Sequence, residues 1–238
     1  SRCLRLVSPG EPMSASLKVV RPGLFDTVQD TGRTGYMALG IPTAGAMDRI
    51  GLRLANALVG NPPDTAGIEI GVMGPDLLVE ADSVRVALVG RLSPSLIEGP
   101  DAPPKPLEAD RTHLLKRGQI LRVGMIEGAS TAYLSVAGGL ALPPFMGSLS
   151  TYSRAGIGGF DGRRLAAGDS LPLVLASAAP GDERKLGVAF DYDRGPIRVV
   201  WGPQDEYFSD EGKRTFITAE YRASKEADRM GIRLEGPV

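Results

Sequence analysis

Short runs of β-branched and other apolar residues, separated by turn-forming residues, recur along this 238-residue chain. Glycine and proline are frequent, at 31 and 19 residues, and they fall between the runs rather than in one segment. Runs that follow one another at about 8 to 12 residues are typical of a β-barrel or sandwich, not of alternating strands and helices. The predicted strands are Leu17–Val20, Leu77–Glu80, Val84–Val89, Gln119–Val123, Thr131–Val136 and Ile197–Trp201.

Asp48 and the residues after it predict the first of two short helices. Asp48 is a good N-cap, because its carboxylate accepts hydrogen bonds from the amides of a first turn. Gly60-Asn61-Pro62 then ends the helix, since glycine favours the C-terminal cap and proline does not continue a helix. The residues at helical spacing that are expected to face the core are Ile50, Leu54, Ala57 and Leu58.

A second short helix is expected to begin near Ser209. Asp210 and Glu211 fall in its first turn, where negative charge suits the positive end of the helix dipole. Phe216 and Ile217 would then form its buried side. The chain is therefore predicted to be mostly β with two short helices.

Residues 176–196 are rich in small, polar and turn-forming residues and are expected to form a linker or long loop. This segment divides the chain into a flexible N-terminal lead at 1–16, a β domain at 17–175 and the start of a second β unit at 197–238. The last segment is short for an independent core. It either completes the first domain or begins a second one.

The charge balance and the lack of long apolar runs exclude several classes of protein. Lys and Arg total 27 and Asp and Glu total 28, so the net charge of −1 gives no reason to expect nucleic acid or an anionic membrane as partner. No apolar run reaches the roughly 20 residues of a membrane span, and residues 1–16 lack the apolar centre of a signal peptide. The single cysteine, Cys3, forms no internal disulfide. We therefore expect a cytoplasmic protein.

The chain contains one histidine, His113. A catalytic triad would need this imidazole in place, and no Gly-x-Ser-x-Gly nucleophile motif accompanies it. A zinc site needs several Cys and His ligands, so no metal site is expected. We interpret His113 as an ordinary strand-edge residue. Acid–base chemistry would then depend on carboxylates, Lys, Tyr or bound water.

The segment Gln29-Asp30-x-Gly32-Arg33 has two interpretations. Asp30 and Arg33, three residues apart in a glycine-containing turn, can face one pocket, where the guanidinium suits a carboxylate or phosphate. Alternatively, Asp30 pairs with Arg33 and fixes the turn.

Asp48 also has two interpretations, a simple N-cap or a site residue beside Gly45-Ala46, where a ligand can approach the backbone and an anionic group can meet the helix N-terminus. Asn56 and Glu69 are polar residues in apolar surroundings, and for both we favour a buried hydrogen-bonded role over a site role.

The loop from Arg154 to Arg164 is the strongest candidate for an anion site. Its glycines, among them Gly158 and Gly159, can expose backbone amides, and arginines such as Arg163 bracket them. The alternative is a long hairpin loop with solvated arginines. Further along the chain, Gln204-Asp205 follows a predicted strand directly, and Asp228, Arg229 and Arg233 supply either site charge or surface ion pairs.

Ten short segments follow one another in a characteristic order. They are Pro22–Tyr36, Gly45–Asp48, Leu54–Asn56, Val59–Asn61, Ala137–Gly139, Gly147–Thr151, Gly158–Gly159, Gly162–Arg163, Gly202–Asp205 and Asp228–Gly236. In this order they resemble the allophanate hydrolase subunit 2 family. That family includes the C-type subunit of 5-oxoprolinase, the antagonist of a sporulation-kinase inhibitor, and a lobe of the carboxyltransferase domain of urea carboxylase.

The resemblance implies a cyclophilin-like β-barrel. Because the family continues beyond the segment that ends at Gly236, it also implies that the second β unit is incomplete at the C-terminus. These are expectations about the fold.

The resemblance further implies a subunit of a multi-component, ATP-dependent amidohydrolase, similar to the C-type subunit of 5-oxoprolinase or to allophanate hydrolase subunit 2. ATP would act at the level of the complex, the partners would be a subunit 1 or B-type protein and a separate A-type protein, and the substrate would be a small amide. The implied catalytic carboxylates are Asp30, Asp48 and Asp205. The implied substrate- or anion-binding residues are Gln29, Arg33, Arg154, Gly158, Gly159, Arg163 and Gln204.

Two alternatives remain open from the same resemblance. One is a carboxyltransferase lobe that transfers a carboxyl group from carboxybiotin to urea or a related amide. The chain has no Met-Lys-Met biotinylation motif, so biotin would then be carried by a separate protein. The other is a non-catalytic antagonist that binds a sporulation-kinase inhibitor.

Overall fold

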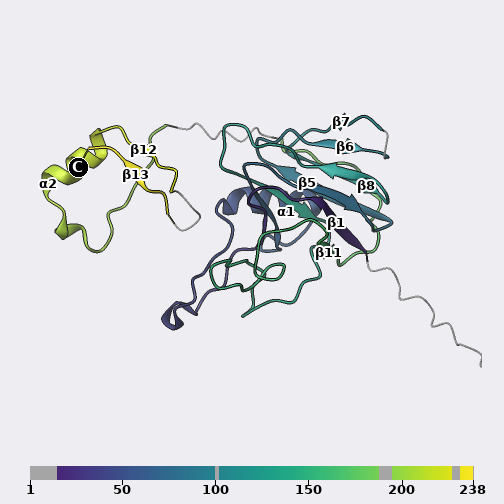
Figure 1. The fold of residues 1–238 in the computed structure, drawn as a ribbon, viewed down its shortest axis with the longest axis horizontal. Coiled ribbons are helices and arrows are strands. Elements are labelled where there is room, and N and C mark those ends of the chain that lie inside the picture. The colour runs from purple at the N-terminus through teal and green to yellow at the C-terminus, as the bar shows by residue number, and fades with distance from the viewer. Residues whose placement is uncertain (1–14, 100–101, 188–194, 227–230, 238) are drawn as a thin grey trace, which may run out of the picture. The chain divides into compact units, whose positions relative to one another are not determined.

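The computed structural model of the chain describes residues 15–99, 102–187, 195–226 and 231–237. The chain divides into two compact units, Ser1–Phe190 and Asp191–Val238, and each is described by itself (Figure 1). Residues 1–14, most of the predicted N-terminal lead, lie outside the described residues, as does Cys3.

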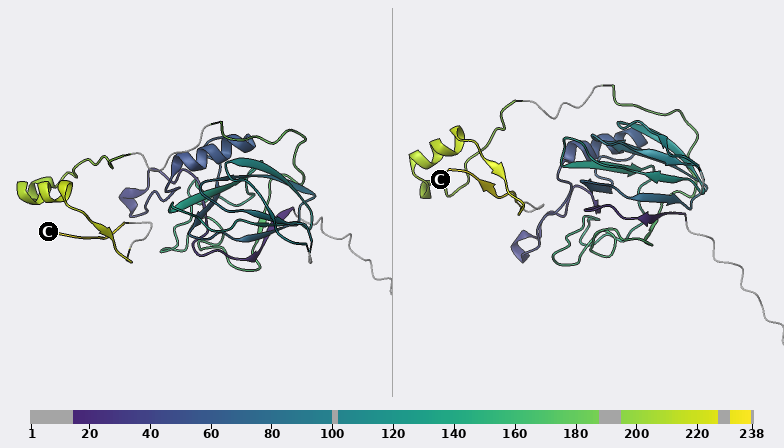
Figure 2. Two further views of the ribbon diagram at one scale, coloured as in Figure 1. Left: turned by 90° about the horizontal axis from the view of Figure 1, so that it is seen from above. Right: turned by 45° about the horizontal axis from the view of Figure 1, so that its top comes forward.

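The first unit contains two antiparallel sheets, which Figure 2 shows from two further sides. In spatial order, the six-stranded sheet consists of β11 (Ser170–Pro172), β1 (Ser16–Arg21), β4 (Asp76–Val79), β9 (Ile120–Arg122), β6 (Ser95–Ile97) and β7 (Lys105–Pro106). The five-stranded sheet consists of β2 (Thr27–Gln29), β3 (Gly67–Gly71), β10 (Thr131–Val136), β5 (Ser83–Val89) and β8 (Arg111–Lys116).

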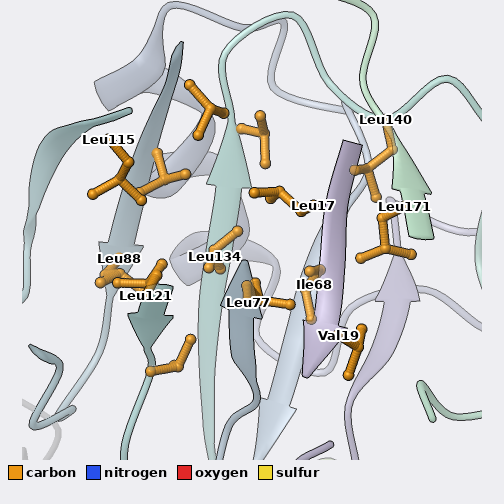
Figure 3. Close-up of a cluster of buried hydrophobic side chains, with 14 of the residues drawn as sticks. Leu17, Val19, Ile68, Leu77, Leu88, Leu115, Leu121, Leu134, Leu140 and Leu171 are labelled. Atoms are coloured by element: carbon orange, nitrogen blue, oxygen red, sulfur yellow. The ribbon is translucent and has the colours of Figure 1, made fainter. Parts of the chain in front are cut away.

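The main core lies between these two sheets. Figure 3 shows Leu17 and Leu77 from the six-stranded sheet in one cluster with Leu88 and Leu134 from the five-stranded sheet. Side chains alternate between the faces of a strand, so the inward positions of β5 and β10 supply this core. The outward positions of the same strands, which include Ala87, Val89 and Tyr133, are buried too. These two strands are therefore buried on both faces.

The outward face of β5 and β10 is covered by α1 (Arg49–Val59). The helix begins as predicted, because Asp48 Oδ1 accepts hydrogen bonds from the amides of Ile50 and Gly51, each at 2.9 Å. It ends at Gly60, whose φ of 79° lies in the left-handed region that favours glycine.

The predicted buried face of α1 is partly wrong. Ile50 is 57% exposed and Ala57 is exposed, whereas the buried side chains include Leu52, Ala55 and Leu58. Both sets recur at helical spacing, and the docking of the helix on the sheet decides between them. Asn56 is also buried, and its Nδ2 donates to the carbonyl of Thr65 at 2.7 Å, as expected for a buried structural amide.

The prediction of a mostly β protein with two short helices is confirmed, and five of the six predicted strands overlap β1, β4, β5, β9 and β10. The predicted closed barrel is not formed by the strand pairings of the described residues, which give two separate sheets. Single bridges such as Met73–Met125 and Leu92–Ile126 connect residues that lie next to the ends of these strands. Isolated bridges are too short to continue a ladder around a barrel.

The strand β8 forms one edge of the five-stranded sheet and contains His113. The Nε2 atom of His113 lies 2.7 Å from the carbonyl oxygen of Glu108, so the interpretation as a strand-edge residue is confirmed. A segment of the predicted linker runs beside β8. The amide of Thr112 donates to the carbonyl of Arg184 at 2.8 Å, and the amide of Leu186 donates to that of Asp110 at 2.9 Å.

The second unit contains η2 (Asp205–Tyr207), α2 (Asp210–Thr218), and a two-stranded sheet of β12 (Arg222–Ala223) and β13 (Leu234–Glu235). Ser209 caps α2 as predicted, with Asp210 and Glu211 in the first turn. The predicted burial of Phe216 and Ile217 is wrong, since these side chains are 39% and 65% exposed. Neither α1 nor α2, the α-helices of the described residues, is long and apolar enough to cross a membrane.

The predicted strand Ile197–Trp201 is wrong. These residues are irregular, and Ile197 and Val200 are more than 90% exposed, because no neighbouring strand among the described residues pairs with them. Trp201 instead packs on Phe216 of α2, with ring centroids 5.9 Å apart. The start of a second β unit at 197–238 stays a prediction.

Asp26 is a buried carboxyl group in the turn between β1 and β2. It is 1% exposed, its Oδ2 accepts a hydrogen bond from the Gly23 amide at 2.8 Å, and its Oδ1 has no partner among the described residues. Burial raises the pKa of Asp26 to about 7, although the Gly23 hydrogen bond opposes this. The folded protein therefore binds a proton here that the unfolded chain releases near pH 4.

We expect Asp26 to make the protein less stable as the pH rises from about 4 to about 7, because the folded state holds the proton more tightly than the unfolded state. The pKa shift of Asp26 corresponds to a loss of on the order of 4 kcal/mol in the free energy of unfolding across this pH range. Above about pH 7 the carboxyl group is ionised in both states, and its contribution no longer changes. Urea unfolding of the parent and Asp26→Asn between pH 4.5 and 8 measures it. As the pH rises, the parent should lose several kcal/mol of unfolding free energy relative to Asp26→Asn. A difference between the two proteins that does not depend on pH would contradict the prediction.

Candidate functional site

Asp30 follows β2 directly and connects two parts of the first unit that are far apart in sequence. Its carboxylate accepts hydrogen bonds from Ser148 Oγ at 2.7 Å, the Leu149 amide at 2.6 Å and Ser150 Oγ at 2.5 Å. It also accepts from the amide of Gly32 at 2.7 Å, which shapes its own loop. Asp30 is 8% exposed, so four donors hold a nearly buried carboxylate. Such bonds to a charged acceptor are among the stronger ones in a protein.

Arg33 binds the same segment from the same loop. It is 1% exposed, its Nη2 donates to the carbonyl oxygen of Ser150, and its guanidinium carbon lies 5.9 Å from the centre of the Phe145 ring. Burial lowers the pKa of Arg33, and the nearby charge of Asp30 partly opposes this. Nε and Nη1 of Arg33 have no partner among the described residues. Asp30 and Arg33 therefore fix residues 148–151 together, rather than simply pairing with each other.

Gln29 completes this contact and is fully buried. Its Nε2 donates to Thr27 Oγ1 at 2.9 Å and to the carbonyl of Thr151 at 3.2 Å. Its Oε1 accepts no hydrogen bond from the part of the chain described. Gln29 Oε1 and the two donors of Arg33 are thus buried polar atoms without a hydrogen bond among the described residues, which is uncommon in proteins.

Gly158 and Gly159 lie against the same segment. A Cβ added at Gly158 would come within 2.1 Å of the Ser150 carbonyl and 2.5 Å of Arg33 Nη2, and one at Gly159 within 1.9 Å of Thr151 Oγ1. Both residues also have positive φ. Only glycine fits such positions, so these two residues let the loop close over Arg33.

The rest of the loop from Arg154 to Arg164 offers less to an anion than its sequence predicts. The amides of Gly156, Gly159 and Gly162 donate to carbonyls of the protein itself. Arg163 forms a bidentate pair with Asp169, at 2.7 and 2.8 Å, which raises the pKa of Arg163. An anion at Arg163 would have to displace Asp169. Arg154 is exposed.

Asp48 is the more accessible carboxylate of this region. Its Oδ1 caps α1, while its Oδ2 accepts no hydrogen bond from the described residues. The Asp48 amide donates to Tyr133 Oη at 2.8 Å, and Tyr133 donates to Glu69 Oε2 at 2.8 Å. Burial, together with the charge of Glu69, raises the pKa of Tyr133, so the hydroxyl stays protonated. These hydrogen bonds of Tyr133 and Glu69 attach the start of α1 to the five-stranded sheet.

The two halves of this region are directly connected. The amide of Ala46 donates to the carbonyl of Asp30 at 2.8 Å, and the amide of Arg33 donates to that of Thr43 at 2.8 Å. Ala44 has a φ of 54° and Met146 a φ of 49°, which non-glycine residues rarely adopt. Strain of this kind is common near functional sites. We therefore take the loops at 30–48 and 145–163 as the candidate site.

Two predicted site residues belong to the second unit, which is described by itself. Gln204 and Asp205 belong to the second unit, where Asp205 pairs with Lys213 at 2.8 Å and the pKa of Asp205 is lowered by that pair. Their predicted site roles stay predictions. Asp228 and Arg229 lie outside the described residues, and Arg233 pairs with Glu226.

Ser148, Ser150 and Tyr133 are the residues that sequence reasoning missed. The serines stood in a segment already noted, but only their contact with Asp30, 118 and 120 residues away, gives them a role. Tyr133 stood inside a predicted strand, where its outward position was the available signal. No group of three or more potential metal ligands occurs in the described part of the chain.

Comparison with known proteins identifies the family of the chain. The family model described as "Carboxyltransferase domain, subdomain A and B" matches residues 39–238. The C-type subunit of 5-oxoprolinase from Escherichia coli (strain K12) is 34% identical over 93% of this chain and 69% of its own length. Urea amidolyase of Lachancea kluyveri is 31% identical over 93% of this chain, but the chain spans only 13% of that protein.

Solved structures show the same fold. The crystal structure of the Kluyveromyces lactis urea carboxylase matches with a TM-score of 0.78 and 30% identity. The match covers 95% of this chain and 21% of that one. The chain thus corresponds to a small part of the longer relatives.

Asp30→Asn tests whether the four donors hold these loops together. An amide NH2 in place of one oxygen would face hydrogen donors, so we expect a loss of about 2 kcal/mol or more of unfolding free energy. Asp64→Asn, at an exposed position after α1, is the matched control and should change stability by less than about 0.5 kcal/mol. Urea unfolding of both variants measures this, and equal stability would show that the contacts are dispensable.

Proposed function

The chain belongs to the carboxyltransferase domain family, subdomain A and B, and from this premise we propose that it is a subunit of an ATP-dependent amidohydrolase of the 5-oxoprolinase type. The observation that carries the proposal is the match to the C-type subunit of 5-oxoprolinase, which runs over more than two thirds of that protein. The substrate would be a small cyclic or linear amide. The enzyme would act in the cytoplasm, together with a B-type subunit and a separate A-type subunit.

Within this chain we propose Asp48 as the residue that meets the substrate. It is the carboxylate of the first-unit candidates that keeps an oxygen without a hydrogen bond among the described residues, at the exposed start of α1. A carboxylate there suits a general base, which needs a free acceptor within reach of the proton it takes. Asp30 and Arg33 are then positioning residues, since their bonds run to residues 148–151.

For ATP, the loop from Arg154 to Arg164 does not fit a phosphate cradle. Three amides of the glycine-rich loop already donate within the loop or to the neighbouring Leu149, and Arg163 is held by Asp169. We therefore propose nucleotide use at the level of the complex and assign no residue of this chain to it.

A second function is favoured by a specific observation. The family description and the urea amidolyase relatives support a carboxyltransferase lobe that would transfer a carboxyl group from carboxybiotin, held by a separate carrier, to urea or a related amide. The two functions share the fold and the candidate site. They differ in the co-substrate, ATP with 5-oxoproline in one case, and carboxybiotin with urea or a related amide in the other.

Reconstitution tests the proposed function. We expect the purified chain alone to show no turnover of 5-oxoproline, and the mixture with B-type and A-type subunits to release phosphate and glutamate only when ATP and 5-oxoproline are both present. Turnover by the single chain would contradict the need for partners. A complex that consumes carboxybiotin and urea but leaves 5-oxoproline intact would establish the second function instead.

Asp48→Asn separates catalysis from capping at this position. Asn is as good an N-cap as Asp, so the melting temperature should stay within about 2 °C of the parent. Loss of a general base should lower turnover of the reconstituted complex by about 10²-fold or more. The exposed Asp64→Asn is again the control, expected to retain parental turnover. Turnover of Asp48→Asn within about threefold of the parent would remove Asp48 from the site.

A further inference from the structure

Three loops of the first unit bring exposed apolar side chains together. The amide of Leu24 donates to the carbonyl of Met73 at 3.0 Å, and the amide of Ile126 donates to that of Val72 at 2.9 Å. Met73 also bridges Met125. The apolar side chains that these contacts bring together are between 45% and 54% exposed, and we name them the Val72 patch: Leu24, Phe25, Val72 and Met125.

Val72 holds an unfavourable backbone conformation in this patch. Its φ is 67°, and the amide of Met73 donates to the carbonyl of Gly71 at 2.8 Å across it, which makes a tight three-residue turn. A β-branched residue with positive φ is a true outlier, and glycine would adopt this turn more easily. Because the Val72 side chain is 45% exposed, burial in this chain does not explain why valine stands here.

The Leu24–Phe25 turn packs closely beside Val72 and Met73. Gly23 lets the turn approach, because a Cβ there would lie 2.1 Å from both Asp26 Oδ2 and the Met73 carbonyl. Phe25 packs on Gly71, where a Cβ would lie 2.9 Å from the Phe25 Cβ. The patch thus lies on short, tightly packed turns, and close packing of the backbone lowers the conformational entropy that a surface loses on binding.

Arg164 gives the patch its charge. Its guanidinium carbon lies 4.8 Å from the centre of the Phe25 ring, and its Nη1 donates to the Leu24 carbonyl at 3.1 Å. Its Nε and Nη2 make no hydrogen bond to the described residues, so they are available to a carboxylate. Asp26, the carboxyl group next to Phe25 in sequence, is buried and offers no surface charge. Aromatic, Met and Arg side chains are the types enriched at protein–protein interfaces.

We propose that the Val72 patch with Arg164 is the surface on which the partner protein docks, and that the partner presents apolar side chains flanked by a carboxylate. The carboxylate of the partner would pair with the available donors of Arg164. The apolar side chains of the partner would cover Val72, which is exposed and has a strained backbone. The inference rests on the proposed function for the identity of the partner, the B-type subunit.

Val72→Gly is the sharpest test, because it separates folding from binding. Glycine relieves the backbone strain, so the melting temperature should be unchanged or higher, while the side chain is lost from the patch. We expect the dissociation constant for the purified B-type subunit, measured by calorimetry, to rise about 10-fold or more. Arg164→Glu should weaken binding further and remove part of its salt dependence. Leu114→Ser, at a 41% exposed position on β8, is the control and should bind like the parent.

Each outcome decides the proposal. Weaker binding by Val72→Gly and Arg164→Glu but not Leu114→Ser supports it. Parental binding by both patch variants overturns the patch while leaving assembly, and so the proposed function, intact. If the parent chain does not bind the B-type subunit at all, both the docking surface and the proposed assembly fail. If sedimentation shows that the parent chain self-associates and Val72→Gly does not, the patch serves a second copy and the partner assignment is wrong.

Discussion

The two-sided burial of β5 and β10 is the constraint on which the rest of the first unit depends. Their inward side chains fill the space between the sheets, and their outward side chains must be covered by α1. This fixes where the helix lies, and with it the position of Asp48 at its start. Tyr133 uses the same outward row of β10 to reach Glu69 and the Asp48 amide. The part of the candidate site at Asp48 is therefore fixed by the sheet.

A second level of order comes from Asp30, which ties residues far apart in sequence without a sheet ladder. The loops at 30–48 and 145–163 have few regular elements, yet they converge on one carboxylate and one buried guanidinium. Rigid loops of this kind can hold unfavourable conformations such as those of Ala44 and Met146. The same principle explains how Val72 keeps its turn at an exposed position.

The sequence was sufficient for local structure and for family, and insufficient where long-range contacts decide. Asp48 and Gly60 are the capping residues of α1, and capping depends on residues close in sequence. Both ends of the helix were therefore predictable. The buried face of α1 was not, because Ile50 and Leu52 fit helical spacing equally well and the sheet selects Leu52. The glycines and arginines around Arg163 predicted an anion site, but the guanidinium of Arg163 is already paired with the carboxylate of Asp169. Ile197–Trp201 had strand propensity without a strand to pair with.

The segment beside β8 has a consequence for how this chain behaves in solution. An edge strand with open amides and carbonyls is a template for pairing with other molecules, and Arg184 and Leu186 occupy part of that template in this chain. Glu183 adds a side-chain lid by accepting from the Leu114 amide at 3.0 Å. A fragment cut before residue 183 would expose the edge of β8 and would be prone to aggregate edge to edge. Residues 183–186, which have the composition of a linker, thus cover the edge of β8 and oppose pairing between molecules.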